Sequence, residues 1–387
     1  MQNISITVLS LFDGMSCGQI ALNKLGIKVK QYYASEIDKY AMQVTQHNFP
    51  DTIQLGDVRN VHGKDLPKID LLIGGSPCQG FSFAGKGLNF NDPRSALFFE
   101  FVRLMKETQP TYFMLENVKM KKEHELVISQ YMNVAPIEIN SALLSAQNRV
   151  RLYWTNINQK PYGLFGDMIS DIPQPKDKGI LLKDILETEV ADKFYLSSKM
   201  LKYVLDKNES NKEKNGFNYN FGNENSKTNT ILSRYGKDGK QCLIVASRGR
   251  NPENPKSRQS GLETEQMLEP RFDGKTNCIT SVQKDNLVMQ LNHNQQKKFN
   301  PNINADKANT LTLAQGRAGS SEEYMDAVSK IAKLTSRIRR LTPTECERLQ
   351  TVPDGYTSTV SDTQRYRMLG NGWTVDVIAY IFSFLKM

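Results

Sequence analysis

The 387-residue sequence has few cysteines and histidines, and they are widely spaced. No two cysteines stand at the two-residue separation that zinc and redox sites use. The five cysteines are Cys17, Cys78, Cys242, Cys278 and Cys346, and the four histidines are His47, His62, His124 and His293. We therefore expect free thiols in a reducing compartment, no bound metal and no histidine acting as a base.

Long hydrophobic runs are also missing. The N-terminal apolar run, residues 4–12, is too short to span a membrane, and no basic segment precedes it as in a signal peptide. This predicts a cytoplasmic protein that does not contact a membrane. Basic residues outnumber acidic ones, and the net charge of +9 favours an anionic partner over a neutral metabolite. A solvated lysine-rich surface explains the same excess equally well.

The first part of the sequence alternates short apolar runs with longer segments of helical periodicity. Such alternation is typical of a parallel sheet wrapped by helices, so we predict an α/β fold. The predicted strands are residues 4–12, 31–34, 52–55, 69–73 and 112–115, with two more within 136–144 and 152–155. A polar or reactive residue follows each of the first five strands, and these side chains should converge on one crevice at the carboxyl edge of the sheet.

The middle of the sequence has a different character. From about residue 157 to 335 the apolar runs shorten, helical periodicity is mostly absent, and an imperfect repeat occurs at 227–232, 275–280 and 307–312. This predicts a small, mostly β domain inserted into the first one. Helical periodicity is present in 94–106 and returns from Thr342 onward, with a closing apolar helix at 375–385. We therefore predict a first part at 1–190, an inserted domain at 191–335 and a closing part at 336–387.

The most informative stretch is 74–82, which directly follows a predicted buried strand. Its glycines and Pro77 fix a turn that presents Cys78 at the carboxyl end of the strand, where a nucleophile can reach a substrate. A buried structural cysteine is the alternative interpretation.

Several short motifs occur in one order along the chain. They are Phe12-Asp13-Gly14, Ser76-Pro77-Cys78-Gln79, Glu116-Asn117-Val118, Gln147-Asn148-Arg149-Val150-Arg151, Arg340-Leu341-Thr342-Pro343-Thr344-Glu345 and Leu369-Gly370-Asn371-Gly372. Together they resemble the cytosine-5 DNA methyltransferase family of bacterial or phage type, over residues 4–157 and 337–385. Trp373 departs from the Asn-Ser-Val or Asn-Ala-Val of many bacterial members and looks more like the animal de novo DNA methyltransferases.

The resemblance implies a covalent mechanism. Cys78 would add to carbon 6 of cytosine so that carbon 5 can accept a methyl group, while Glu116 protonates or hydrogen-bonds nitrogen 3. Arg149 and Arg151 would hold the base carbonyl and the loop that carries Cys78. Without the resemblance, Glu116 is an ordinary acid at a strand end and the arginines are surface charges.

The resemblance also implies S-adenosylmethionine as the cofactor, with S-adenosylhomocysteine as the product. The turn from Asp13 to Gly18 has neither the full G-x-G-x-x-G fingerprint nor a P-loop lysine, so a pyrophosphate is not expected. Glu36 follows Asp13 at close to the offset of about 20 residues at which an acid binds ribose hydroxyls. By the resemblance, Asp57 matches the family residue that binds the adenine amino group. The predicted cofactor residues are Phe12, Asp13, Gly14, Met15, Ser16, Cys17, Glu36, Ile37, Asp57, Val58, Pro77, Asn371, Gly372 and Trp373.

A DNA substrate requires further residues, because a thiol in a crevice reaches a duplex base only after the base is flipped out. The inserted domain would then be a target-recognition domain, with arginines that pair with guanine in the major groove. The predicted DNA-binding residues are Ser82, Lys86, Arg94, Arg248, Arg250, Arg258 and Arg271. For any single arginine, simple solvent exposure is the alternative. We expect a monomer on double-stranded DNA, and a cognate restriction endonuclease is a further candidate partner.

Two rival functions remain open at this point. An RNA cytosine-5 methyltransferase, such as the tRNA-modifying branch of the same family, would use the same motifs but normally lacks so large a middle region. A DNA-binding homologue without catalysis would not need Cys78 and Glu116. The Asp or Asn-Pro-Pro-aromatic turn of amino-methylating enzymes does not occur in the sequence.

Overall fold

The computed structural model describes residues 5–76, 96–162, 167–197, 200, 204, 221–222, 225–238, 243–245, 248–250, 265–267 and 338–386. The chain divides into two compact units, which we describe separately. The first consists of Met1–Ile185, Lys227–Asp238 and Pro343–Met387, and the second of Leu186–Ser226 and Gly239–Thr342.

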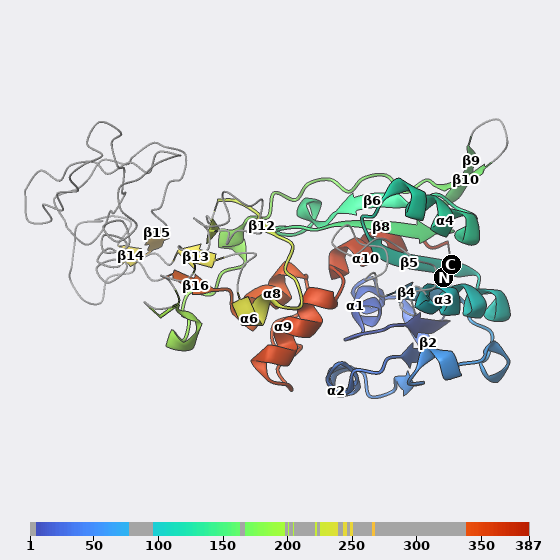
Figure 1. Cartoon of the computed structure of the whole chain (residues 1–387), viewed down its shortest axis with the longest axis horizontal. Coiled ribbons are helices and arrows are strands. Elements are labelled where there is room, and N and C mark those ends of the chain that lie inside the picture. Colours follow the sequence, from blue (N-terminus) through green and yellow to red (C-terminus); the bar gives the residue numbers. More distant parts are fainter. Residues whose placement is uncertain are drawn as a thin grey trace, which may run out of the picture. The chain divides into compact units, whose positions relative to one another are not determined.

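A seven-stranded sheet forms the centre of the first unit (Figure 1). Its strand order is β3-β2-β1-β4-β5-β8-β6, in which neighbours from β3 to β5 are parallel and β8 is antiparallel to both β5 and β6. The bounds are β1 Ser5–Leu11, β2 Lys28–Ser35, β3 Ile53–Gln54, β4 Leu71–Gly75, β5 Tyr112–Val118, β6 Ile137–Asn140 and β8 Val150–Thr155. The five parallel strands and the two additional ones predicted from the sequence are confirmed.

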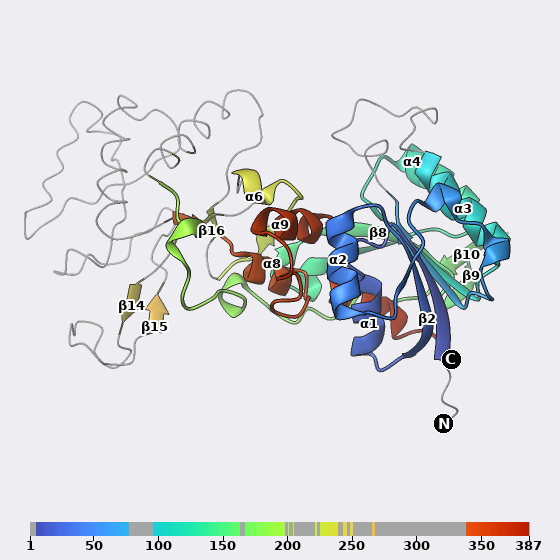
Figure 2. The same ribbon diagram turned by 90° about the horizontal axis from the view of Figure 1, so that it is seen from below.

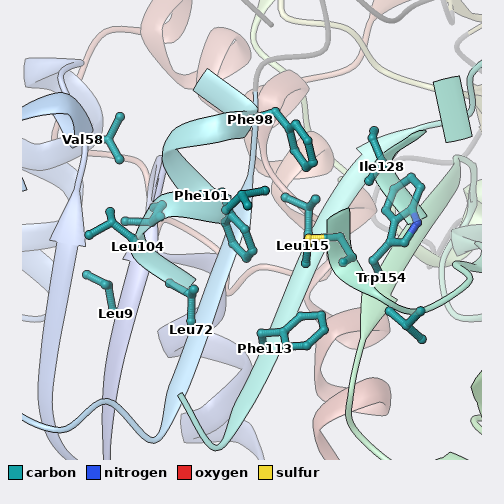
Figure 3. Packing of buried hydrophobic residues seen from close by; sticks show 14 of the residues in the cluster. Leu9, Val58, Leu72, Phe98, Phe101, Leu104, Phe113, Leu115, Ile128 and Trp154 are labelled. Atoms are coloured by element: carbon teal, nitrogen blue, oxygen red, sulfur yellow. The ribbon is translucent and has the colours of Figure 1, made fainter. Parts of the chain in front are cut away.

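Helices cover both faces of this sheet. Helix α3 (Ala96–Thr108) packs Phe98, Phe101 and Leu104 against strand side chains such as Leu72 (Figure 3). On the opposite face, helix α1 (Cys17–Lys24) approaches the neighbouring strand residue Ile73 closely. Because successive side chains of a strand point to opposite faces, a strand covered on both sides must be apolar throughout. This explains the uninterrupted apolar run of β4.

The C-terminal segment Pro343–Met387 belongs to the first unit. Helix α9 (Asp362–Asn371) lies beside both α8 (Pro343–Leu349) and the short helix α6 (Tyr235–Asp238) (Figures 1 and 2). The closing helix α10 (Val375–Phe382) packs against α1, and Asp376 forms ion pairs with Lys24 and Lys178. The other α-helices in the described part of the chain are α2 (Lys39–Asn48) and α4 (Lys122–Met132).

A short stretch from the middle of the sequence also belongs to the first unit. Strand β12 (Thr228–Asn229) pairs in parallel with β7 (Gln147–Asn148), so the first copy of the internal repeat lies against the motif that carries the two arginines. The Lys227 ammonium donates to the carbonyl of Ala142 and pairs with Asp177. The other two copies of the repeat lie outside the described residues.

The described part of the second unit consists mainly of short strands. Strands β11 (Phe221–Gly222), β13 (Leu243–Val245) and β16 (Ile338–Arg340) form one small sheet, and β14 (Arg248–Arg250) pairs with β15 (Glu265–Met267). The functional limits 191–335 for target recognition remain a prediction. Among the described residues of either unit, no helix is both long and apolar enough to cross a membrane.

Candidate active site

The site lies at the carboxyl ends of the parallel strands. Because β1, β2, β4 and β5 run in the same direction, the residues that follow them share one edge of the sheet. These are the Phe12–Gly14 turn after β1, Glu36 after β2 and Ser76 after β4, with Glu116 near the carboxyl end of β5.

The turn after β1 has an unusual backbone. Phe12, Gly14 and Ser16 have positive φ angles of 57°, 59° and 59°, and for the two non-glycine residues this conformation is costly. The carboxylate of Asp13 braces the turn from inside, since it accepts hydrogen bonds from Ser16 and, at 2.8 Å, from the Tyr32 hydroxyl. Burial raises the pKa of Asp13 to about 6. Asp13 therefore shapes the predicted cofactor turn, and its carboxylate is directed into the protein.

Glu36 closes over the same turn. One carboxylate oxygen accepts from the Gly14 amide at 2.8 Å, and the other accepts from the amides of Ile37 and Asp38, also at 2.8 Å. A carboxylate has about four lone-pair sites, so one remains for a ligand hydroxyl. The Ile37 side chain beside it is 74% exposed, the most exposed of the large apolar side chains in the described part. A spare acceptor beside an exposed apolar surface fits the ribose and purine of an adenosine group.

The predicted adenine residues after β3 are only partly available to a ligand. Hydrogen bonds from the Arg59 side chain and amide lower the pKa of Asp57 to about 2, so this carboxylate is ionised. The Val58 side chain is buried in the main hydrophobic cluster. Asp57 can therefore accept from an amino group, whereas Val58 can contact a ligand only through its backbone.

Met15 and Cys17 are buried and lie against Gly372. Gly372 is the last residue of the Leu369–Gly372 motif, which we call the closing motif. A Cβ on Gly372 would lie 2.9 Å from Met15 Cε and 3.4 Å from Cys17 Sγ, so any other residue would displace the end of the Met15 side chain. Burial raises the pKa of Cys17 to about 12, and its thiol stays protonated. The preceding Asn371 is exposed.

Two side chains hold the carboxylate of Glu116. It lies opposite Gly75 of β4 and Tyr153 of β8 and is 8% exposed. Its Oε1 forms an ion pair with Arg151 Nε at 2.9 Å, and its Oε2 accepts from the indole Nε1 of Trp373 at 3.1 Å. No local sequence pattern predicts this last contact; the sequence predicts Trp373 only as a cofactor residue.

The two arginines of the Gln147–Arg151 motif have different partners in the structure. Arg149 is 2% exposed and donates to the carbonyls of Ile231 at 3.2 Å, Gly370 at 3.2 Å and Gly372 at 2.8 Å. Burial lowers the pKa of Arg149 to about 9. Its donors thus hold the closing motif, while Arg151 holds Glu116.

The segment with the predicted nucleophile begins at Ser76. The Ser76 hydroxyl accepts a hydrogen bond from the side-chain amide Nδ2 of Asn117 at 3.3 Å. Asn117 therefore ties the start of the Ser-Pro-Cys turn to the strand that carries Glu116. Residues predicted for the site but lying outside the described part are Pro77, Cys78, Ser82, Lys86, Arg94, Arg258 and Arg271. Arg248 and Arg250 are in β14 of the second unit. Across the described residues, no group of three or more His, Cys, Asp or Glu side chains could hold a metal ion.

Comparison with known proteins decides the family. The model of C-5 cytosine-specific DNA methylase matches residues 6–386. The chain belongs to this family. It is therefore an enzyme of the DNA methyltransferase class, and the family resemblance inferred from the ordered motifs is confirmed. Methyltransferases of this family use S-adenosylmethionine.

Individual relatives agree with this placement. The chain is 36% identical to the type II methyltransferase M1.ScrFI of Lactococcus lactis subsp. cremoris, over 63% of this chain and 65% of that protein. It is 29% identical to the orphan methyltransferase M.SPRI of Bacillus phage SPR, over 98% of this chain and 97% of that one. The Entamoeba histolytica methyltransferase EhMeth has the same fold, with a TM-score of 0.60 at 15% identity over 99% of this chain and 100% of that one.

Proposed function

We propose that this protein methylates carbon 5 of a flipped cytosine within a specific sequence of duplex DNA, through a covalent adduct between Cys78 and carbon 6. The observation that supports it best is the place of Glu116. This buried acid is paired in register with Gly75, which precedes Cys78 by only three positions in the sequence, and its carboxylate is held by the partly buried Arg151. An acid held in this way fits a group that must meet one ring nitrogen.

Each residue on the base side then has a defined task. The Cys78 thiolate adds to carbon 6 while Glu116 protonates nitrogen 3, so the electron pair of the double bond becomes available at carbon 5. After carbon 5 has gained the methyl group, it loses its hydrogen as a proton, the Cys78 sulfur leaves with its bonding pair, and nitrogen 3 returns its proton to Glu116. Arg151 keeps the Glu116 carboxyl group beside the base throughout.

S-adenosylmethionine supplies an electrophilic methyl group when bound. We assign its adenosine to Glu36, Ile37 and Asp57, since these residues offer an acceptor for hydroxyls, an apolar surface and an ionised acceptor for an amino group. The backbone of the turn from Phe12 to Ser16 would face the remainder of the cofactor. Met15, Cys17 and Gly372 stabilise this turn from within.

DNA recognition is assigned to the middle region. Arg248, Arg250, Arg258 and Arg271 would read base edges, and Ser82, Lys86 and Arg94 would contact the DNA near the flipped base. The net charge of +9 is in keeping with a polyanionic partner. A restriction endonuclease that cuts the same sequence is a further proposed partner, in the manner of the relatives named type II methyltransferases.

A labelling experiment tests the function. The protein is incubated with tritiated S-adenosylmethionine and either duplex DNA or tRNA, and a Cys78→Ser variant serves as the control. We expect label in DNA with the wild type and none with the variant, while the variant unfolds at the same temperature. Label in tRNA alone would establish the rival RNA function, and full activity of the variant would refute the covalent role of Cys78. Bisulfite sequencing of DNA from an expressing host would then identify the recognition sequence.

A further inference from the structure

Trp373 occupies a position that is fixed on both sides along the chain. The Gly372 carbonyl before it accepts from Arg149 at 2.8 Å, and the Gly372 amide donates to the Met368 carbonyl at 2.7 Å. The Thr374 hydroxyl after it donates to Gln350 Oε1 at 2.8 Å. Because hydrogen bonds hold both Gly372 and Thr374, the backbone position from which the Trp373 side chain extends is fixed.

The polar edge of this ring is directed at the catalytic carboxyl group. Indole has one polar atom, Nε1, and in Trp373 it donates to Glu116 Oε2 at 3.1 Å. The other oxygen of Glu116 is taken by Arg151 at 2.9 Å. Two donors from distant parts of the chain therefore hold the two oxygens of one carboxylate, which fixes the plane of the carboxyl group.

Gly75 provides the room for this contact. It lies opposite Glu116 in the pairing of β4 with β5. A Cβ at this position would stand 2.9 Å from both Glu116 Oε2 and Trp373 Nε1, a distance that real Cβ atoms do not tolerate. Any residue other than glycine would push the donor and the acceptor apart.

We propose that Trp373 is a positioning residue, which holds the Glu116 carboxyl group in the orientation required at nitrogen 3 of the base. The inference rests on the proposed function, because it concerns the acid that this function requires. The predicted role of Trp373 on the methionine side of the cofactor stays a prediction, because the indole N–H and the ring face can serve different partners.

The test is a Trp373→Phe variant, which keeps an aromatic ring and removes the donor. With duplex DNA as substrate, we expect kcat to fall about 10-fold, as for loss of one hydrogen bond to a charged group. The KM for S-adenosylmethionine and its dissociation constant measured without DNA should both stay within about twofold. An unchanged kcat, or a raised KM for the cofactor with kcat retained, would overturn the proposal.

The second tryptophan of the chain provides a matched control. Trp154 also donates through Nε1, to the Ser129 hydroxyl at 2.9 Å, but it is part of the hydrophobic core. Trp154→Phe should lower the unfolding temperature and leave kcat within about twofold. A kcat loss in Trp154→Phe equal to that in Trp373→Phe would show that general destabilisation is the cause, and would also overturn the proposal.

A double variant shows whether Trp373 acts through Glu116. In a Glu116→Gln background, adding Trp373→Phe should change the single-turnover rate less than about twofold, and a further 10-fold loss would contradict the proposal. Failure of the proposed function is a separate result, seen as no label in DNA with the wild type or as full activity of Cys78→Ser. An active wild type, an inactive Cys78→Ser and a Trp373→Phe variant with wild-type kinetics would defeat the inference alone.

Discussion

Glu36 and Glu116 both stand at the carboxyl edge of the same sheet, but different parts of the chain hold their carboxylates. Glu36 accepts from Gly14 and from its two following residues, so its partners are close in sequence or belong to the adjoining turn. Glu116 is held by Arg151 and by Trp373, which is 257 positions away. The proposed cofactor side is thus built from local turns, whereas the proposed base side is assembled only when the C-terminal segment has returned.

This comparison predicts that the two sides can be damaged separately. The largest effect should come from Glu116→Gln, which removes the acid of the base side. We expect kcat to fall about 100- to 10,000-fold, the usual contribution of a positioned general acid. The dissociation constant for S-adenosylmethionine, measured by calorimetry, should not change. A variant with more than a tenth of the wild-type kcat would contradict the assignment of Glu116.

The second prediction concerns the residue that ties the closing segment down. Arg149→Met leaves three buried carbonyl oxygens without their donor, so the free energy of unfolding should fall by about 2 to 4 kcal/mol. Arg151→Met, two positions away, should cost less stability and mainly reduce kcat. Urea unfolding of both variants measures the difference. Equal losses of stability would mean that the arginines share one task after all.

The third prediction uses the raised pKa of Asp13. Because its pKa of about 6 in the folded protein lies above the 3.8 of a free side chain, the folded state favours the protonated form. The loss of folding stability caused by Asp13 is absent below about pH 4, grows as the pH rises to 6, and is complete above that, at about 3 kcal/mol. Asp13→Asn should remove this pH dependence. Unfolding free energies of both proteins between pH 4 and 8 test it, and parallel curves would refute a raised pKa.

The smallest effect should come from Glu36→Gln on the cofactor side. The amide replaces one acceptor oxygen by a donor that faces backbone N–H groups, so we expect the dissociation constant for S-adenosylmethionine to rise about 10-fold. The kcat at saturating cofactor should stay within about threefold. A large loss of kcat would show that the two sides of the sheet edge are coupled, against the comparison above.

Much of the fold could be predicted from local patterns. The continuous apolar run of β4 and the helical periodicity of α3 are properties of short segments, and the order of motifs was enough to identify the family. The same local reasoning identified Glu36 and Glu116 as acids at strand ends. Such predictions succeed because the periodicity of a strand or a helix can be recognised from residues that are close together in the sequence.

The sequence alone therefore determined the sheet, the family and the ordered acids at its edge. Only the tertiary structure decided that Arg149 turns inward to three carbonyls, that residues 227–238 join the first unit, and that Trp373 donates to Glu116. The physical reason is that these contacts are long-range in the sequence. Each of these contacts joins residues far apart in the chain, and its geometry depends on close approaches, as at Gly75, that no local pattern records.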